Sequence, residues 1–236
     1  MTKRVRRRKA ILLIGLKEST SPESFRDAFR NEAQGATNNE LTEVWSLPVP
    51  EREMPRIAHQ VLMEDSPPPF DAVVQLASDS PDAPLADRLE AIANRLAPWI
   101  DRSRSAVLVG EEIKITTGDG AVQIVMPLRR RPELTHDQFM EHWFERHADL
   151  GEAVEGVRYR QNHVDYSATD ALRERLGFTF EPMDGLTESY FGSSNEAFEL
   201  MSREEVAIGA IEDEKRFIDH SRSQFGFYRI VGEAAA

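Results

Sequence analysis

The chain contains no cysteine, and this absence removes several kinds of site at once. None of its 236 residues can form a disulfide, act as a thiolate nucleophile, or hold an iron–sulfur cluster or a Cys-rich zinc ion. A cysteine-free chain is compatible with any compartment, and a cytoplasmic location is our default expectation.

Long apolar runs and excess positive charge are also missing. No segment approaches the roughly 18 consecutive apolar residues that span a bilayer. The apolar run of residues 10–16 ends at Lys17, so we expect neither a membrane helix nor a targeting segment. The formal net charge is -12, from 41 acidic and 29 basic residues. We therefore expect no nucleic acid and no membrane as partners, because both attract clustered positive charge.

The one local excess of positive charge lies at the N-terminus. Residues 1–9 contain Lys3, Arg4, Arg6, Arg7, Arg8 and Lys9. A solvated, frayed tail is the leading interpretation, because charge runs at chain ends are usually disordered. Contact with the acidic surface of a partner subunit is the alternative.

The most informative feature that is present is an internal repeat. Residues 101–105 read DRSRS and lead into an apolar run that ends in Gly-Glu, and residues 219–223 read DHSRS before a similar run. Other landmarks recur in the same order, which a chance match of five residues would not produce. The sequence predicts two copies of one domain, at 10–118 and 119–236, after a basic tail at 1–9.

Both copies show the same predicted order of elements. In the first copy we expect strands at 11–16, 41–47, 72–76 and 105–109, with helices from Ser21 and over 84–96. In the second we expect strands at 122–128, 156–164, 185–191 and 224–231, with helices over 135–151 and 195–217 and a polar insertion at 165–182. The order β-α-β-β-α-β is that of a ferredoxin-like module. We therefore predict an α+β fold in which two such sheets cover each other as an intramolecular, pseudo-dimeric α+β barrel.

The second copy also carries a series of spaced motifs. They are RRRPELT at 129–135 followed by Phe139, Trp143 with His147-Ala148, YRQNHV at 159–164, Asp184-Gly185 with Glu188 and Phe191, and DEKRFID at 213–219 with Ser221-Arg222-Ser223. From about Val122 to Glu233, this copy resembles the EthD family of the dimeric α+β barrel superfamily. The resemblance implies the barrel fold and chemistry without a cofactor, as in related lyases, decarboxylases, dehydratases, isomerases, polyketide cyclases and quinol-oxidising monooxygenases. It does not fix the reaction, because one fold supports many.

Three side chains of the second copy are the candidate catalytic residues. His147 lies on the apolar face of its predicted helix, where it could act as a general acid or base or be a hydrogen-bonded core histidine. His163 shares a strand face with other polar side chains, which indicates either a pocket wall or a solvated face. Glu188 shares a face with Tyr190 and would need a partner if buried, from His147, His163 or Arg222.

The candidate substrate-binding residues surround these three in the predicted elements. They are Trp143, Tyr159, Gln161, Asn162, Tyr190, Phe191 and Arg222. No metal site is expected, because His142 and His147 are five residues apart and lie about 140° apart on a regular helix. No nucleotide-binding motif is present, so we expect no cofactor. The first copy lacks the histidines, and we therefore place the site in the second.

These observations predict an acid–base enzyme of the lyase, decarboxylase, isomerase or cyclase type, acting on a small-molecule substrate. An aromatic, polyketide-like or cyclic carbonyl compound is the expected class. A cofactorless monooxygenase is the enzymatic alternative. Outside enzymes, the alternative is a non-catalytic protein of a degradation pathway that binds a hydrophobic small molecule or supports a partner oxidase. A homodimer of such chains is allowed, although internal closure does not require it.

Overall fold

Eight strands form one closed antiparallel barrel in the computed structural model, which describes residues 4–35, 41–54 and 69–234. The strands are β1 (Val5–Ile14), β2 (Thr42–Pro48), β3 (Ala72–Ser78), β4 (Ala106–Lys114), β5 (Val122–Leu128), β6 (Tyr159–Val164), β7 (Gly185–Phe191) and β8 (Gly226–Ala234). Their order around the barrel is β1-β3-β2-β8-β5-β7-β6-β4, and every neighbouring pair is antiparallel. The predicted α+β class is confirmed, and each half of the chain contributes four adjacent strands.

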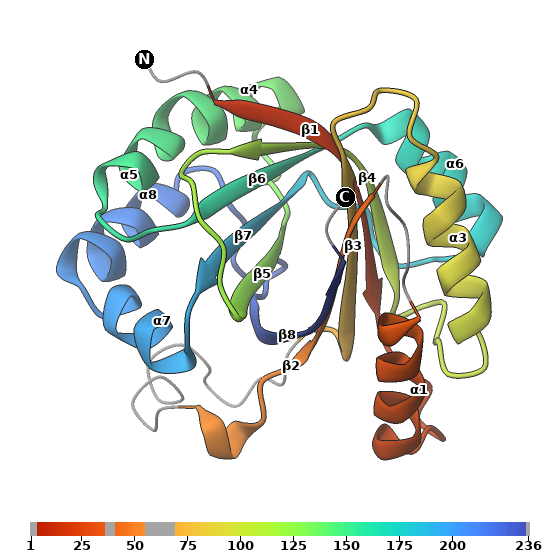
Figure 1. Ribbon diagram of the computed structural model, residues 1–236. Helices are drawn as coiled ribbons and strands as arrows, with labels where there is room; N and C mark the ends of the chain where they lie inside the picture. Colours follow the sequence, from red (N-terminus) through yellow and green to blue (C-terminus); the bar gives the residue numbers. More distant parts are fainter. Residues whose placement is uncertain (1–3, 36–40, 55–68, 235–236) are drawn as a thin grey trace.

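Helices cover the outside of the barrel on two sides (Figure 1). They are α1 (Pro22–Gln34), α3 (Leu85–Leu96), α4 (His136–Glu141), η2 (His142–His147), α5 (Ala148–Ala153), α6 (Tyr166–Leu176), α7 (Ser194–Met201), η3 (Glu205–Ala210) and α8 (Ile211–Glu214), with a short 3₁₀ turn η1 (Glu51–Glu53) after β2. One side carries α1, α3 and α6, and the other carries α4, α5, α7 and α8. No helix in the described part of the chain is long and apolar enough to cross a membrane.

The first helix of each half begins at the cap residue that the sequence predicted. Ser21 caps α1 by accepting a hydrogen bond from the Ser24 amide, and Phe25 and Phe29 are buried against the sheet. Thr135 and Gln138 form a reciprocal capping box at the start of α4. In both α1 and α4, the side chain of the residue before the helix accepts a hydrogen bond from an amide in its first turn and so fixes where the helix begins.

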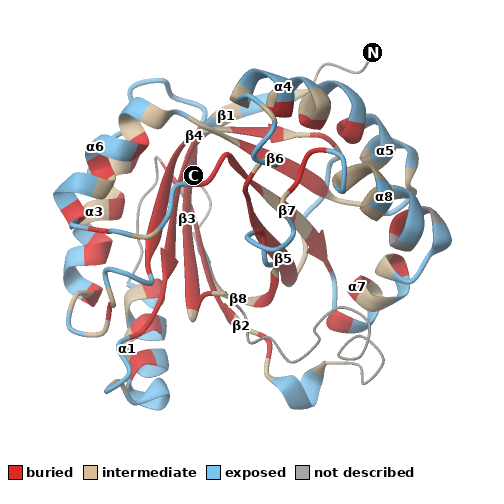
Figure 2. Cartoon of the chain, turned by 180° about the vertical axis from the view of Figure 1, so that it is seen from behind, coloured by how far each residue is buried: buried red, intermediate tan, exposed pale blue. Residues whose placement is uncertain are grey.

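The strands are buried on both faces (Figure 2). On β1, Ile11 and Leu13 point into the barrel, whereas Ala10 and Leu12 pack against the outer helices. Alternate residues along a strand therefore enter two different cores, one inside the barrel and one between the barrel and the helices.

The N-terminal basic run is part of the barrel from Val5 onward, which corrects the expectation of a frayed tail for that part of residues 1–9; residues 1–3 lie outside the described residues. Strand β1 begins at Val5 and pairs with β4 from Val5 to Leu13. Arg7 Nε lies 2.6 Å from Glu112 Oε1, and Lys9 Nζ lies 2.7 Å from Glu112 Oε2. The ladder and this buried carboxylate order the strand in spite of its charge.

The segment at 165–182, which the sequence predicted only as a polar insertion, contains helix α6. Asp165 caps the helix by accepting from the Ala168 amide, and Gly177 closes it with a φ of 65°. Its side chains Leu172 and Leu176 pack in the core that covers the first half of the barrel. A segment of the second half thus completes the outer layer of the first.

The two repeated pentads make equivalent contacts in the two halves. The Gly15 amide donates to Ser105 Oγ at 3.0 Å, and the Arg129 amide donates to Ser223 Oγ at 2.9 Å. A carboxylate fixes the next amide in each half, through the pairs Leu16 with Asp71 at 2.8 Å and Arg130 with Asp184 at 2.9 Å. The final serine of each pentad therefore anchors the end of the first strand of its half.

Candidate functional site

A cavity of about 530 Å³ lies between the outer face of β5, β6 and β7 and the helices that cover them. Most of its wall is apolar, formed by Ile124, Met126, Leu150, Val154, Val157, Phe191, Leu200, Met201, Val206, Ala210, Ile211 and Phe225. Its polar lining consists of His147, Tyr159, Thr187, Ser189, Glu214, His220, Ser223 and Gln224. This volume and mixture are typical of a site for a small organic molecule.

His147 is held at the wall of this cavity by Asp213. Its Nδ1 lies 3.0 Å from Asp213 Oδ2, and its side chain is 10% exposed. Because a carboxylate can only accept there, the neutral form of His147 carries its proton on Nδ1, and its Nε2 is an acceptor that lies 3.8 Å from Glu214 Oε1. Burial tends to raise the pKa of Asp213, but hydrogen bonds from His142 and His147 hold that pKa below its ordinary value. The imidazole is therefore oriented by an anion.

The second histidine on Asp213 corrects the expectation that His142 and His147 point in different directions. His142 Nε2 lies 3.0 Å from Asp213 Oδ1, so one carboxylate binds both rings. The reason is that η2 is a π-helix, whose wider turn brings residues five apart to the same side. The 140° rotation applies only to a regular α-helix.

A second acid–base pair stands beside His147. Glu214 Oε1 lies 3.8 Å from His147 Nε2, and Glu214 Oε2 lies 3.0 Å from His220 Nε2. His220 is 36% exposed, compared with 22% for Glu214. The group of ionisable side chains therefore extends from the cavity wall to solvent.

Tyr159 also lines this cavity. Its hydroxyl oxygen accepts from Trp143 Nε1 at 2.9 Å and from Gln161 Nε2 at 3.2 Å. In both contacts the oxygen is the acceptor, so neither of them uses the hydroxyl hydrogen. Burial raises the pKa of Tyr159 well above its ordinary value and keeps the phenol protonated. The centroids of the His147 and Tyr159 rings are 6.3 Å apart.

His163 is not among the residues that line the cavity, contrary to the expectation that it forms a pocket wall. It packs between the rings of Trp143 and Phe144, and its Nε2 lies 3.0 Å from Gln161 Oε1. Burial, together with the charge of Arg6, lowers the pKa of His163 to about 4. A neutral, tightly packed imidazole therefore lies between the sheet and η2.

Glu188 lies inside the barrel, so its expected partnership with His147, His163 or Arg222 is wrong. Its carboxylate is 3.2 Å from Lys9 Nζ and accepts from the Tyr190 hydroxyl at 2.8 Å. Asn162 donates to it at 3.1 Å. The strand alternation was predicted correctly, but the face that carries Glu188, Tyr190 and Asn162 points away from the cavity.

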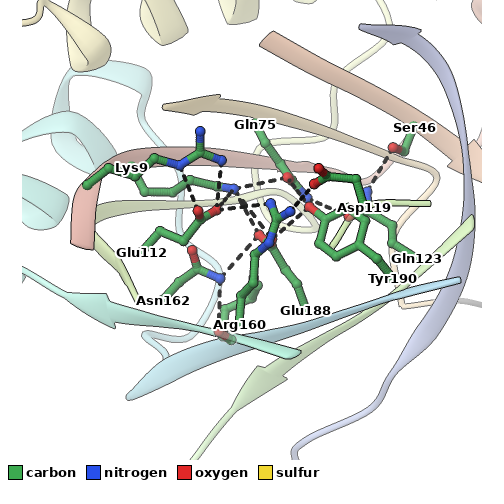
Figure 3. Close-up of polar contacts among 12 residues, drawn as sticks. Lys9, Ser46, Gln75, Glu112, Asp119, Gln123, Arg160, Asn162, Glu188 and Tyr190 are labelled. Carbon is green, nitrogen blue, oxygen red and sulfur yellow. Dashed lines mark hydrogen bonds and ion pairs between the residues drawn. The ribbon is translucent and has the colours of Figure 1, made fainter. Parts of the chain in front are cut away.

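These residues belong to a polar network that crosses the barrel interior (Figure 3). Lys9 lies between Glu112 and Glu188, and Arg160 contacts Glu112 at 3.4 Å and covers the Tyr190 ring at 4.1 Å. Attraction to Lys9, Arg160 and Arg7 keeps the pKa of Glu112 low in spite of burial. The network joins side chains of both halves through ion pairs.

Arg222 lies at a second hollow of about 460 Å³, away from His147. It forms an ion pair with Glu181 there. Tyr166, His136 and Asp184 line the same hollow, and the Tyr166 hydroxyl lies 2.9 Å from both His136 Nδ1 and Asp184 Oδ1. Of the ten predicted site residues, His147, Tyr159 and Phe191 line the cavity. Trp143 and Gln161 support it through Tyr159.

Three ionisable residues at or directly behind the cavity wall were not singled out from the sequence. Asp213 and Glu214 stood in the quoted DEKRFID motif, but no role was given to them. His220 is the one position at which the second pentad differs from the first, where Arg102 occupies the same place. That difference was the available signal for His220. Among the residues that the structure describes, no group of three or more His, Asp or Glu side chains has metal-binding geometry.

Comparisons with known proteins place this barrel in a structural class. An anthrone oxidase-like protein aligns with a TM-score of 0.56 and 11% identity, covering 98% of this chain and 93% of that chain. A candidate chlorite dismutase aligns with a TM-score of 0.53 and 10% identity, covering 96% and 95%. A candidate monooxygenase from Lactobacillus acidophilus gives 0.52 and 9%, covering 98% and 97%. Identities this low show a shared fold alone.

A comparison with protein-family models matches part of the second half of the chain. Residues 131–221 match the family model of the EthD domain, which confirms the resemblance inferred from the motifs. The match contains His147, Tyr159, Asp213, Glu214 and His220. No curated protein matches the chain.

Proposed function

We propose that the protein is an acid–base enzyme that moves a proton on a small, apolar carbonyl or phenolic compound. The observation that carries this proposal is the meeting of two groups in one cavity, a histidine oriented by a carboxylate and a tyrosine whose hydroxyl hydrogen is not used by its contacts with Trp143 and Gln161. Lyase, decarboxylase, isomerase and cyclase reactions all contain this proton transfer. Aromatic, polyketide-like and cyclic carbonyl compounds are the substrate classes that fit the wall.

In this proposal, His147 is the general base. Its Nε2 removes a proton from carbon next to a carbonyl group, and the bonding electrons move to the carbonyl oxygen. Asp213 stabilises the imidazolium that forms, because the carboxylate stays ionised beside it. Return of the proton to another carbon gives isomerisation, and loss of a leaving group gives a lyase reaction.

Tyr159 is the electrophile of the same step. Its hydroxyl donates to the oxygen on which negative charge develops, and the contacts from Trp143 and Gln161 fix its direction. A fixed donor in a site with little water stabilises such charge strongly, and losing one costs about 2.7–4 kcal/mol of barrier.

Anthrone is a suitable probe, since a structural neighbour is described as anthrone oxidase-like. Exchange of its acidic C–H protons in D₂O, followed by NMR without oxygen, reports proton transfer alone. We expect exchange above the buffer rate for the native protein and a loss of about a hundredfold or more for His147→Gln and for Tyr159→Phe. A native protein that binds anthrone but leaves its exchange at the buffer rate would contradict the acid–base role and support a binding protein.

A cofactorless monooxygenase is the second candidate, because the same proton removal generates the carbanion that reacts with O₂. Oxygen uptake with anthrone as substrate separates the two. Uptake matched to anthrone consumption supports oxygenation, and exchange without uptake supports the proposed lyase or isomerase class.

We further infer that the two halves are copies of one ferredoxin-like module, divided near residue 118. The matched serine and aspartate contacts of the two pentad regions support this inference, as does the equivalent strand order of the halves. In this account the second copy, 119–236, carries the site and the first closes the barrel.

A further inference from the structure

The cavity wall differs from the second hollow in its basic side chains. None of the described residues that line the cavity is Lys or Arg, although the second hollow is lined by Arg130 and Arg222. The protein has 29 basic residues, so the lack of Lys and Arg among the described lining residues reflects where the basic residues lie and not a shortage of them. A site for a carboxylate, sulfonate or phosphate ordinarily presents Arg or Lys to it.

The polar end of the cavity is instead acidic. Glu214 lines the wall at 22% exposure, and Asp213 lies directly behind His147 at 13% exposure. The remaining polar groups on the wall are neutral hydroxyls and an amide, together with His147 and His220. Among the described lining residues, an anionic ligand would therefore meet the Glu214 carboxylate and no Lys or Arg; the two histidines on the wall are already paired with Asp213 and Glu214.

From this distribution we propose that the cavity selects uncharged ligands, and that Glu214 determines this specificity by repelling anions. The inference rests on the proposed function only in assigning ligand binding to this cavity. The preferred ligands are neutral fused-ring or aromatic compounds with a carbonyl or hydroxyl group at the His147 end. Carboxylic acids, sulfonates and acyl phosphates of the same size are excluded.

A matched pair of fluorescent probes tests this proposal without knowledge of the substrate. N-phenyl-1-naphthylamine is neutral, and 1-anilinonaphthalene-8-sulfonate has the same skeleton with one added sulfonate. We expect the neutral probe to bind the native protein at least about tenfold more tightly than the sulfonate. The repulsion between two like charges a few ångströms apart is large enough to lower affinity by about tenfold or more. Equal affinities, preference for the sulfonate, or no saturable binding of the neutral probe would overturn the proposal.

Substitution then assigns the discrimination to one residue. Glu214→Gln should tighten sulfonate binding by about tenfold and change neutral-probe affinity less than about twofold. Glu212→Gln is the matched control, because Glu212 is exposed, pairs with Lys215 and does not line the cavity. Ser189→Phe fills part of the cavity and should abolish binding of the neutral probe. Unchanged discrimination in folded Glu214→Gln, or unchanged neutral binding in folded Ser189→Phe, would refute the assignment.

The binding measurements are independent of catalysis. If anthrone exchange fails while the neutral probe is still preferred, the proposed reaction is wrong and the ligand selectivity holds. If exchange succeeds while the two probes bind equally, the reaction stands and the selectivity is wrong.

Discussion

Replacing Lys9 by Met tests whether the ionic network in the barrel interior holds the two halves together. Lys9 Nζ lies 2.7 Å from Glu112, 3.2 Å from Glu188 and 3.1 Å from Gln75, and the side chain is 1% exposed. Methionine has nearly the same length, so the substitution removes the charge with little change in volume. Any effect on stability then reports the loss of the ammonium group.

The expected cost follows from what each carboxylate retains. Glu112 keeps its contacts with Arg7 and Arg160, whereas Glu188 keeps hydrogen bonds from the neutral donors Tyr190 and Asn162 and only a longer-range attraction to Arg160. Removing one partner of a buried ion pair costs about 3–5 kcal/mol, because the other charge is left buried. A loss of this size is a large part of the roughly 5–15 kcal/mol that stabilises an ordinary domain.

Urea unfolding followed by circular dichroism measures this loss. Lys9→Met should lower the free energy of unfolding by about 3–5 kcal/mol, and adding Glu188→Gln should recover about half, because it removes the unpaired charge. Arg6→Met is the control on the same strand, since Arg6 and Glu111 form a pair about half exposed and worth roughly 0–1 kcal/mol. A loss below about 1 kcal/mol for Lys9→Met, or no recovery in the double variant, would refute this reasoning.

Three further predictions concern the rest of the chain. His163 has a folded pKa of about 4, below its unfolded value of about 6.5. Stability should therefore fall as pH drops from 6.5 to 4, by about 3 kcal/mol in total, and His163→Gln should flatten this part of the urea-unfolding profile. Ser105→Ala and Ser223→Ala should each cost about 1–3 kcal/mol in urea unfolding and add in the double variant; strongly unequal costs would contradict equivalent roles. Asp213→Asn should slow anthrone exchange about a hundredfold or more with the fold intact by circular dichroism, and native-like exchange would contradict its positioning role.

The barrel could be predicted because its signals are local and periodic. Apolar runs marked most of the strands, and Ser21 and Thr135 marked the helix starts. Helix α6 was missed, since a charged segment with few apolar residues gives a weak periodic signal, although Asp165 and Gly177 are ordinary cap residues. Strand β1 was begun too late because the partners of its charges are distant in sequence, Glu112 by 103 residues from Lys9 and Glu188 by 179.

The site was only partly predictable, and the reason is geometric. Alternation correctly grouped Glu188 with Tyr190, and Tyr159 with Gln161 and His163. It could not decide which face meets the ligand, because both faces of a barrel strand are buried. One face points into the ionic network and the other towards the helices, and both carry polar residues.

The pairing of His142 with His147 through Asp213 was beyond sequence reasoning for a different reason. It depends on the π-helical turn of η2, which no residue pattern in the segment marks. Asp213 itself lies 66 residues from His147. Only the packing of α8 against η2 brings the carboxylate to the two rings.

We propose that the chemistry occurs at His147, in the cavity between the helices and the sheet. Anaerobic anthrone exchange by His147→Gln and His163→Gln tests it most directly, because both variants exchange imidazole for amide and only His147 lines the cavity. We predict that His147→Gln loses about a hundredfold or more of the exchange rate, while His163→Gln stays within about threefold of the native protein. Equal losses in the two variants, or a larger loss in His163→Gln, would contradict the account.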